Sequence, residues 1–304
     1  MLASPWDTTF SDPAWTFELK WDGVRCLMYA TDAGVQLQSR AGNDLAARYP
    51  ELVALDLPPN TVLDGEVVAI DESGRPSFQR LQSRRGVDGG GGIVPITYVV
   101  FDLLHHGESL VGAPLEDRVG HLARLDLPAP LVVADSFRGD SRPVWDFVVA
   151  NDLEGIVAKR LSSRYQPGKR SPDWRKIGQF KQVRAVVGGF TAGTGAREPS
   201  FGALLLGLQD GDKLRWIGAV GSGFNDKSLR AIRGALDEMT VGQSPFQSDL
   251  EIPAGATWVQ PRLVAMVRYK QWTTAGRLRA PSFQGMTDTP VGLASWEAEG
   301  PPAA

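Results

Sequence analysis

Apolar residues in the first part of the chain follow two different periods, which together predict a domain of mixed strands and helices. Leucine and valine positions between Leu115 and Leu125 recur at helical spacing after Pro114, a residue that a first helical turn accepts. Runs rich in Val, Ile and aromatic residues predict strands at residues 63–70, 96–104 and 155–158. The pattern therefore predicts a mixed α/β domain over residues 1–182, without giving the order of its strands.

Beyond residue 182 the pattern changes to short strands separated by glycine turns. These strands are expected at residues 183–190, 203–209, 214–220 and 263–269. One helix interrupts them, from about Asp226 to Met239, with Asn225 or Asp226 as its cap. Short strands with one helix predict a small β-barrel of the OB type over residues 183–290. Residues 291–304 are expected to be disordered, and the glycines at 86–92 predict a flexible loop.

Composition narrows the class of protein. The chain has 304 residues, of which 42% are hydrophobic, and no apolar run reaches the roughly 18 residues that a membrane span requires. The formal net charge of -3 excludes a protein that binds nucleic acid by bulk charge alone. The first 14 residues show no secretory signal, and the single cysteine, Cys26, is too few for an internal disulfide. We expect a monomeric, cytoplasmic protein.

Positive charge is concentrated in two stretches. Residues 159–184 contain nine basic residues and one acid, Asp173. Residues 261–279 contain five basic residues and no acid, interleaved with Tyr269 and Trp272. Basic residues mixed with aromatic ones suit a nucleic-acid backbone, although either stretch alone could be a solvated basic face.

The candidate chemistry centres on one lysine. Neither a P-loop nor a complete G-x-G-x-x-G motif occurs in the chain, so neither of these common phosphate-binding loops is available. Lys20 lies between apolar neighbours, ahead of an Asp22-Gly23 turn and Arg25. A lysine is a nucleophile only when its amine is neutral, a form that partial burial and nearby cations favour. An isolated match of this kind could also be a strand-edge lysine beside an ordinary turn.

The match is one of an ordered series. The chain contains KWDGVR at 20–25, SRAG at 39–42, LDGE at 63–66, VFDLL at 100–104, EGIVAK at 154–159 and a basic motif at 170–176. It continues with FGALLLG at 201–207 and RLRAPSF at 277–283. In this order the motifs resemble the ATP-dependent DNA ligases of the covalent nucleotidyltransferase superfamily. The likeness is greatest to the ligase module of bacterial end-joining ligases and their stand-alone relatives.

The resemblance implies an α+β protein with a mixed α/β nucleotidyltransferase (adenylation) domain and a C-terminal OB-fold β-barrel. It implies that Lys20 attacks the α-phosphorus of ATP and forms lysyl-AMP, which passes AMP to the 5′-phosphate of a nick in duplex DNA. The 3′-hydroxyl then displaces AMP and seals the strand. The alternatives are an RNA ligase, a capping-type nucleotidyltransferase, or a nick-binding module that has lost catalysis.

The resemblance also assigns the cationic residues. Arg170 and Lys176 would contact phosphate, and Arg25 and Arg40 would contact either the nucleotide or the nick phosphate. Both transfers crowd negative charge, so cations matter more here than acid or base groups.

The remaining roles belong to the base, the ribose and a metal. Phe101 would stack on adenine, and Glu18 would read the adenine edge. Glu66 would hydrogen-bond the ribose or help to hold a metal, and Glu154 is the main candidate ligand for Mg²⁺, with Mn²⁺ as the alternative. Nicked or broken duplex DNA is the implied substrate. The family also implies the end-binding protein Ku and a separate repair polymerase or nuclease as partners.

The chain departs from the family pattern at two places. The family usually carries K-x-K where this chain has Lys176 followed by Ile177 and Gly178, so one phosphate cation is missing unless Lys181 replaces it. The barrel commonly ends in R-x-D-K, which the resemblance places at Thr287 to Thr289, where only Asp288 remains. Two lost charge-assisted contacts of roughly 1.5 to 3 kcal/mol each would slow self-adenylation by about two to four orders of magnitude.

Overall fold

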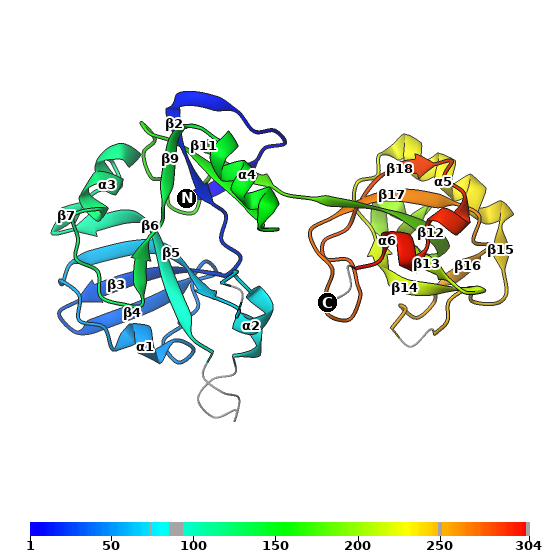
Figure 1. Cartoon of the computed structure of the whole chain (residues 1–304), viewed down its shortest axis with the longest axis horizontal. Helices are drawn as coiled ribbons and strands as arrows, with labels where there is room; N and C mark the ends of the chain where they lie inside the picture. Colours follow the sequence, from blue (N-terminus) through cyan, green and yellow to red (C-terminus); the bar gives the residue numbers. More distant parts are fainter. Residues whose placement is uncertain (73, 85–93, 249–250, 302–304) are drawn as a thin grey trace. The chain divides into compact units, whose positions relative to one another are not determined.

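The chain folds into two compact units, Met1–Gln179 and Phe180–Ala304, coloured from blue to green and from green to red in Figure 1. The structure is a computed structural model that describes residues 1–72, 74–84, 94–248 and 251–301. The units divide close to the boundary expected after residue 182, and the glycine-rich residues 86–92 lie outside the described residues. No helix in these ranges is both long and apolar enough to cross a membrane.

The first sheet of the first unit has five strands in the order β1-β11-β10-β2-β9. Their bounds are Leu2–Pro5 (β1), Ser11–Leu19 (β2), Ser136–Asp140 (β9), Gly155–Arg160 (β10) and Arg170–Gly178 (β11). Strand β1 runs parallel to β11, and the other pairs are antiparallel. One face carries Trp15 and Phe17 against helix α4 (Arg142–Ala150). The opposite face is free to carry polar side chains.

The second sheet has six strands, in the order β4-β3-β5-β6-β7 with β8 paired to β6. Their bounds are Val24–Thr31 (β3), Gly34–Ser39 (β4), Thr61–Ala69 (β5), Ile96–His106 (β6), Glu108–Ser109 (β7) and Leu131–Val133 (β8). Helices α1 (Pro50–Val53), α2 (Phe78–Ser83) and α3 (Leu115–Leu122) complete the unit. The predicted strands at 63–70, 96–104 and 155–158 are confirmed with slightly shifted ends. The predicted helix is also confirmed, with Pro114 as its N-cap.

Two glycines are required where backbones approach closely. Gly155 opens β10 with a φ of 140°, and a Cβ there would lie 2.1 Å from the carbonyl oxygen of Ile177. A Cβ on Gly23 would lie 2.2 Å from the carbonyl oxygen of Val67. The backbone N–H of Lys20 donates to the Gly155 carbonyl at 2.8 Å, so this approach also fixes the backbone of the candidate nucleophile.

The second unit is built on one long strand, β12 (Lys181–Ala192), which pairs with three others. The remaining strands are β13 (Phe201–Asp210), β14 (Lys213–Val220), β15 (Thr240–Val241), β16 (Thr257–Val259), β17 (Val264–Tyr269) and β18 (Ser282–Thr287). A 3-10 turn, η1 (Gly195–Arg197), precedes β13. Helix α5 (Asp226–Glu238) begins at a capping box formed by Asn225 and Ser228, which confirms the predicted helix and cap. This OB-like unit is a seven-stranded sheet, and among the described residues no strand pairing joins β14 to β18.

The tail expected to be disordered is ordered over residues 291–301, so that prediction is wrong there. It forms a 3-10 turn, η2 (Val291–Leu293), and helix α6 (Trp296–Glu299). Ala294 is fully buried, and Glu299 forms an ion pair with Arg184 of β12. Burial of Trp296 against the core of the second unit opposes the flexibility that Pro and Gly confer. Residues 302–304 lie outside the described residues.

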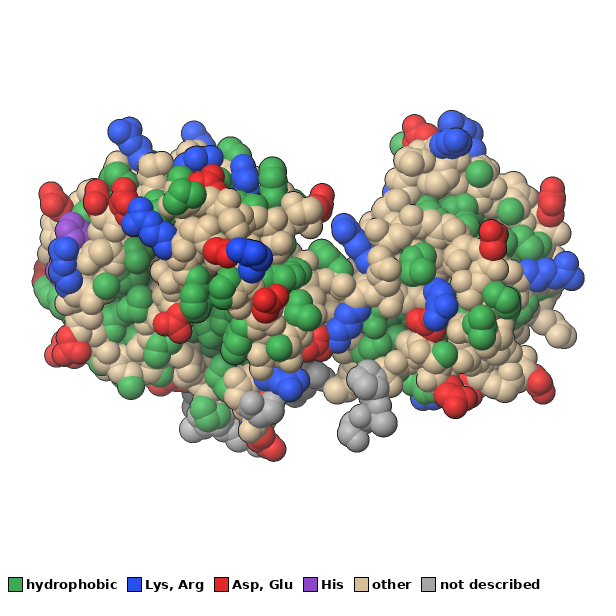
Figure 2. Space-filling view, turned by 45° about the horizontal axis from the view of Figure 1, so that its top comes forward, with side chains coloured by type: hydrophobic (Ala, Val, Ile, Leu, Met, Phe, Trp, Pro, Cys, Tyr) green, Lys and Arg blue, Asp and Glu red, His purple; other side chains and the backbone are tan. Residues whose placement is uncertain are grey.

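Figure 2 shows basic and acidic side chains interspersed over the drawn face of each unit. This distribution agrees with the formal net charge of -3. Recognition of a polyanion would therefore depend on local groups of cations.

Candidate active site

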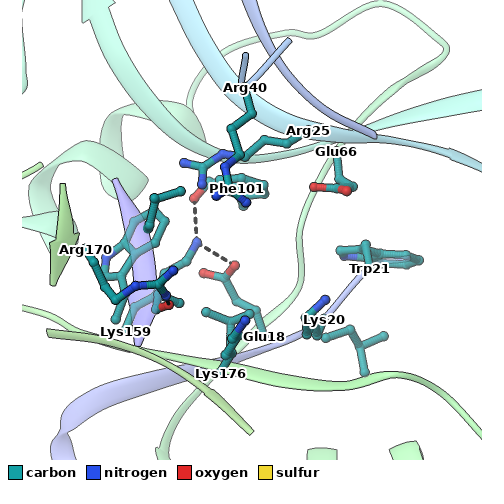
Figure 3. Close-up of a pocket in the computed structure, with 15 residues that line it drawn as sticks. Glu18, Lys20, Trp21, Arg25, Arg40, Glu66, Phe101, Lys159, Arg170 and Lys176 are labelled. Carbon is teal, nitrogen blue, oxygen red and sulfur yellow. Dashed lines mark hydrogen bonds and ion pairs between the residues drawn. The ribbon is translucent and has the colours of Figure 1, made fainter. Parts of the chain in front are cut away.

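The two sheets of the first unit enclose a pocket of about 250 Å³ (Figure 3). All eight residues that the sequence assigned to the nucleophile, nucleotide and phosphate contacts line it: Glu18, Lys20, Arg25, Arg40, Glu66, Phe101, Arg170 and Lys176. The ninth, Glu154, reaches the same site through an ion pair with Lys20. Residues far apart in the sequence therefore meet at one cavity.

The candidate nucleophile, Lys20, follows β2 directly and is anchored by its backbone to Gly155. Its side chain is 25% exposed, and its Nζ pairs with a carboxylate oxygen of Glu154, which is 11% exposed. The sequence predicted flanking cations, whereas the structure gives Lys20 a direct carboxylate partner. The ion pair thereby holds Nζ of Lys20 at the pocket wall, next to Glu154, which directly precedes β10.

A buried ion pair and two aromatic rings line the pocket together, and we call this group the base end: Glu18, Phe101, Lys159 and Trp174. Nζ of Lys159 donates to Oε2 of Glu18 at 2.6 Å and to the carbonyl oxygen of Phe101 at 3.1 Å, as Figure 3 shows. The same ammonium lies 4.4 Å from the ring centre of Phe101 and 4.5 Å from that of Trp174. Burial raises the pKa of Glu18, and the neighbouring Lys159 opposes that rise.

The guanidinium group of Arg25 is held by the Asp64 carboxylate, which accepts hydrogen bonds from two side chains. Its guanidinium contacts Asp64 through two hydrogen bonds of 3.0 and 2.6 Å, and Asp64 is fully buried. The hydroxyl of Tyr165 also donates to Asp64, at 2.7 Å. Burial and the Asp64 carboxylate raise the pKa of Tyr165, which keeps this phenol a donor. Arg25 is thus fixed 5.5 Å from the ring centre of Phe101.

Three exposed cations also line the pocket, and we call this group the phosphate end: Arg40, Arg170 and Lys176. Arg40 follows β4, and Figure 3 shows it approaching the pocket from the side opposite Lys20. Arg170 and Lys176 lie on β11, where Arg170 donates to the carbonyl oxygen of Ala3 in β1. The pocket therefore carries exposed cations of both planar and compact type, which suit phosphate oxygens.

The carboxylates near Lys20 decide whether a metal ion fits. Burial is the main cause that raises the pKa of Glu66 to about 8, while Lys20 and Arg25 oppose it and Glu154 adds to it. Within the described ranges, no group of three His, Cys, Asp or Glu side chains could hold a metal by itself. Glu66 and Glu154 supply hard oxygen donors, so a divalent ion fits here only if substrate oxygens complete its coordination.

Two residues of the base end were not among the predicted site residues. Lys159 closes the EGIVAK motif, and alternation along β10 places it on the same face as the pocket residue Val157. Trp174 likewise shares a face of β11 with Lys176. The alternation was readable in the sequence, but the partner of each side chain was not, because the strand order was unknown.

The departures from the family pattern lie at defined places. Gly178 ends β11, and Lys181 begins β12 in the second unit. Thr287 ends β18, and its hydroxyl lies 2.8 Å from that of Thr289. With Asp288 as its third residue, the four-residue signature begins at Met286, so its two cation positions are Met286 and Thr289, and Thr287 is its variable position.

Comparison with known proteins follows the same division of the chain. The family model described as ATP dependent DNA ligase domain matches residues 1–178, and the one described as ATP dependent DNA ligase C terminal region matches residues 197–289. The multifunctional non-homologous end joining DNA repair protein LigD of Mycobacterium tuberculosis is 39% identical over 280 residues, which cover 90% of this chain and 36% of LigD.

A shorter relative matches over nearly its whole length. The SPbeta prophage-derived DNA ligase-like protein LigB of Bacillus subtilis is 30% identical over 281 residues, which cover 90% of this chain and 93% of LigB. Among solved structures, mycobacterial DNA ligase D complexed with ATP and MES is 36% identical, with 95% of each chain covered and a TM-score of 0.57. The chain thus spans about a third of the LigD relative and almost all of the LigB relative.

Proposed function

Because the chain belongs to the family of ATP-dependent DNA ligases, we propose that it seals 3′-hydroxyl/5′-phosphate nicks in duplex DNA with ATP as the source of AMP. The observation that carries the proposal is the position of Lys20, which lines one pocket together with aromatic and buried polar groups and with exposed cations. A nucleophile that shares a pocket with groups for a base and groups for phosphate suits transfer of a nucleotide to the protein.

In the first step the Lys20 amine attacks the α-phosphorus of ATP. A nitrogen–phosphorus bond forms, the bond from the α-phosphorus to the bridging oxygen breaks, and pyrophosphate leaves. The amine must give up a proton, and the carboxylate of its ion-pair partner Glu154 is the acceptor at hand. Exposed Lys176 and Arg170 balance the charge that develops on the phosphate oxygens.

The base end selects the nucleotide. The ring of Phe101 provides a surface on which adenine stacks. The buried pair of Glu18 and Lys159 offers an acceptor and a donor side by side, which match the amino group and the ring nitrogen on the edge of adenine. Both side chains of this pair are already buried before a base binds.

The later steps use the same cations. AMP passes from Lys20 to the 5′-phosphate of the nick, and the 3′-hydroxyl then attacks that phosphorus and releases AMP. Arg25 and Arg40 lie where planar guanidinium groups can contact the nucleotide or the nick phosphate. Glu66 and Glu154 would hold a divalent ion, Mg²⁺ or Mn²⁺, which would neutralise phosphate charge in these transfers.

We further propose that the first step is slow relative to sealing. The family signature would provide two cations near the leaving pyrophosphate, whereas this chain has Met286 and Thr289 at those two positions. The ATP/pyrophosphate exchange rate of the purified protein tests this point, and a rate equal to that of a relative with the intact signature contradicts it.

Repair of broken DNA ends is the proposed setting, because the LigD relatives are described as non-homologous end joining proteins. Ku and a separate polymerase or nuclease would then be partners of this chain, at the nucleoid in the cytoplasm. Sealing of linear DNA ends in the presence and absence of purified Ku tests the setting separately from the chemistry.

The decisive experiment is incubation with α-labelled ATP and Mg²⁺, followed by a denaturing gel and a chase with nicked duplex DNA. The native chain should carry label that moves into sealed DNA, whereas Lys20→Ala should carry none. Lys213→Ala, an exposed lysine of β14, is the matched control and should label normally. Absence of label on the native chain, together with failure to seal pre-adenylated nicked DNA, would leave only a nick-binding module.

A further inference from the structure

Arginine and tryptophan side chains alternate in a stack on the first sheet, on the face turned away from the pocket. The guanidinium carbon of Arg175 lies 3.8 Å from the ring centre of Trp6 and 4.4 Å from that of Trp15. The guanidinium carbon of Arg160 lies 4.6 Å from the ring centre of the same residue, Trp15. Phe10 packs edge-on against Trp15, with ring centres 5.2 Å apart. The order Trp6, Arg175, Trp15, Arg160 defines what we call the back-face stack.

The stack lies directly behind residues of the pocket. Arg175 sits in β11 between Trp174 and Lys176, both of which line the pocket, and side chains of a strand alternate between its faces. Arg160 follows Lys159 in β10 in the same way. Each arginine of the stack is therefore one residue from a side chain that faces the nucleotide site.

Strand β1, which ends just before Trp6 of the back-face stack, forms part of the pocket wall. Leu2 and Ala3 of β1 line the cavity, and the carbonyl oxygen of Ala3 accepts from Arg170. The pairing of β1 with β11 jumps between Ala3, opposite Ser171, and Ser4, opposite Arg175. An edge strand with such a break in register has fewer regular backbone bonds to fix it, so side-chain contacts matter more.

We propose that Trp6 and Arg175 are positioning residues for the phosphate end of the site. The back-face stack fastens the end of β1 to β11, where the N–H of Trp6 donates to the carbonyl oxygen of Lys176 at 3.0 Å. This contact fixes the backbone that carries Lys176 and the Ala3 carbonyl that orients Arg170. The inference rests on the proposed function, since it concerns the geometry of the cations around the triphosphate.

The chemistry of the stack explains why an arginine occupies this position. A planar guanidinium can lie against two aromatic faces at once, whereas the compact ammonium of lysine cannot stack in the same way. Trp6 remains 41% exposed, so its contribution comes from the contact with Arg175 more than from burial in the core. Helix α4 packs through Val144 and Val148 on the same face, and these side chains belong to the Trp15 and Phe17 cluster.

The test is single-turnover adenylation of Lys20 at several ATP concentrations in Arg175→Met and Trp6→Ala. We expect the rate constant at saturating ATP to fall roughly tenfold, because small displacements of charged groups act on the transition state. The half-saturating ATP concentration should change less than about threefold, since Glu18, Phe101 and Lys159 of the base end lie on strands other than β11. Trp6→Phe, which keeps a ring over Arg175, should recover most of the rate, and Arg175→Lys should recover little.

Two controls separate positioning from loss of stability. Arg142→Met removes an exposed arginine that pairs with Asp140, and it should leave the rate unchanged. Val144→Ala removes apolar contact from the same face of the sheet, and it should lower the unfolding midpoint without lowering the rate constant of the folded protein.

The outcomes are distinct. Rates of Arg175→Met and Trp6→Ala equal to that of the native chain overturn the inference, as does equal slowing of Val144→Ala at matched stability. If either stack variant fails to fold, Trp6→Phe and Arg175→Lys still decide by whether the ring recovers the rate and the lysine does not. Absence of label on the native chain would instead count against the proposed function.

Discussion

The base end and the phosphate end of the pocket, to which we assign the two parts of one nucleotide, differ in burial and in pairing. At the base end Glu18 and Lys159 are 4% and 2% exposed and are already paired with each other. At the phosphate end Arg40, Arg170 and Lys176 are exposed. A buried pair has lost its hydration during folding, so it is rigid and its disruption should affect stability. Exposed cations contribute little to folding, and they can act on a charge that arrives with the substrate.

The largest effect of a substitution is expected at the base end. Lys159→Met should leave the Glu18 carboxylate buried without its partner and lower the free energy of unfolding by about 3 to 5 kcal/mol. It should also abolish labelling of Lys20, because the adenine edge loses its donor. Urea unfolding and the labelling gel measure the two effects separately.

The double variant Glu18→Gln with Lys159→Met sharpens this result. Removal of both charges should recover most of the lost stability, because no buried charge remains unpaired. Labelling should stay absent in the double variant. A single variant as stable as the native chain would contradict the view that this end is held by a buried ion pair.

The phosphate end should respond in rate and not in stability. Lys176→Met removes one charge-assisted contact of roughly 1.5 to 3 kcal/mol, so the rate constant of adenylation should fall by about 10- to 150-fold. Its free energy of unfolding should stay within about 0.5 kcal/mol of the native value. A loss of stability as large as that of Lys159→Met would remove the distinction between the two ends.

Affinity for the base should depend on the aromatic face. Phe101→Ala removes a stacking contact of about 1 to 3 kcal/mol, so the half-saturating ATP concentration should rise by roughly 5- to 150-fold. Phe101→Tyr keeps the ring and is the matched control. Measurement at saturating ATP should show a much smaller change in rate constant, and a change confined to the rate constant would mean that the ring does not bind the base.

Salt should produce the smallest effect. An increase in KCl from about 50 to 200 mM should raise the half-saturating ATP concentration only a few-fold, through screening of the exposed cations. The ratio of the half-saturating ATP concentrations at the two salt levels should be the same in Phe101→Ala as in the native chain, because Phe101 belongs to the base end. A variant-dependent ratio would show that the two ends are electrostatically coupled.

The fold was predictable where apolar residues dominate a strand and not where the site lies. Strands β5 and β6 have buried residues at most positions, and their runs were found from the sequence. Strand β11 reads RSPDWRKIG and was not predicted as a strand, because one face carries site residues and the other carries the back-face stack. The polar and charged side chains of β11 interrupt the alternation of apolar and polar residues that reveals a strand.

The sequence predicted which residues belong to the candidate site, but it did not predict which side chains form ion pairs with one another. Ordered motifs identified Lys20, Glu18 and Lys176, which the structure brings to one pocket. No spacing predicted that Glu18 pairs with Lys159, or that fully buried Arg118 pairs with Asp102. Such pairs depend on which strands become neighbours, and that order follows from the packing of the whole unit.

The close approach at Gly155 bears on how this protein tolerates change in a mutational scan. Gly155 and Gly23 have no side chain that could take part in chemistry, yet any Cβ at either place would collide with a backbone carbonyl. In a saturation library both positions should therefore be as intolerant as Lys20, including to alanine. An activity screen alone would score the three positions alike. A parallel screen for folded protein would separate the two glycines, which shape the scaffold, from the lysine, which is the proposed nucleophile.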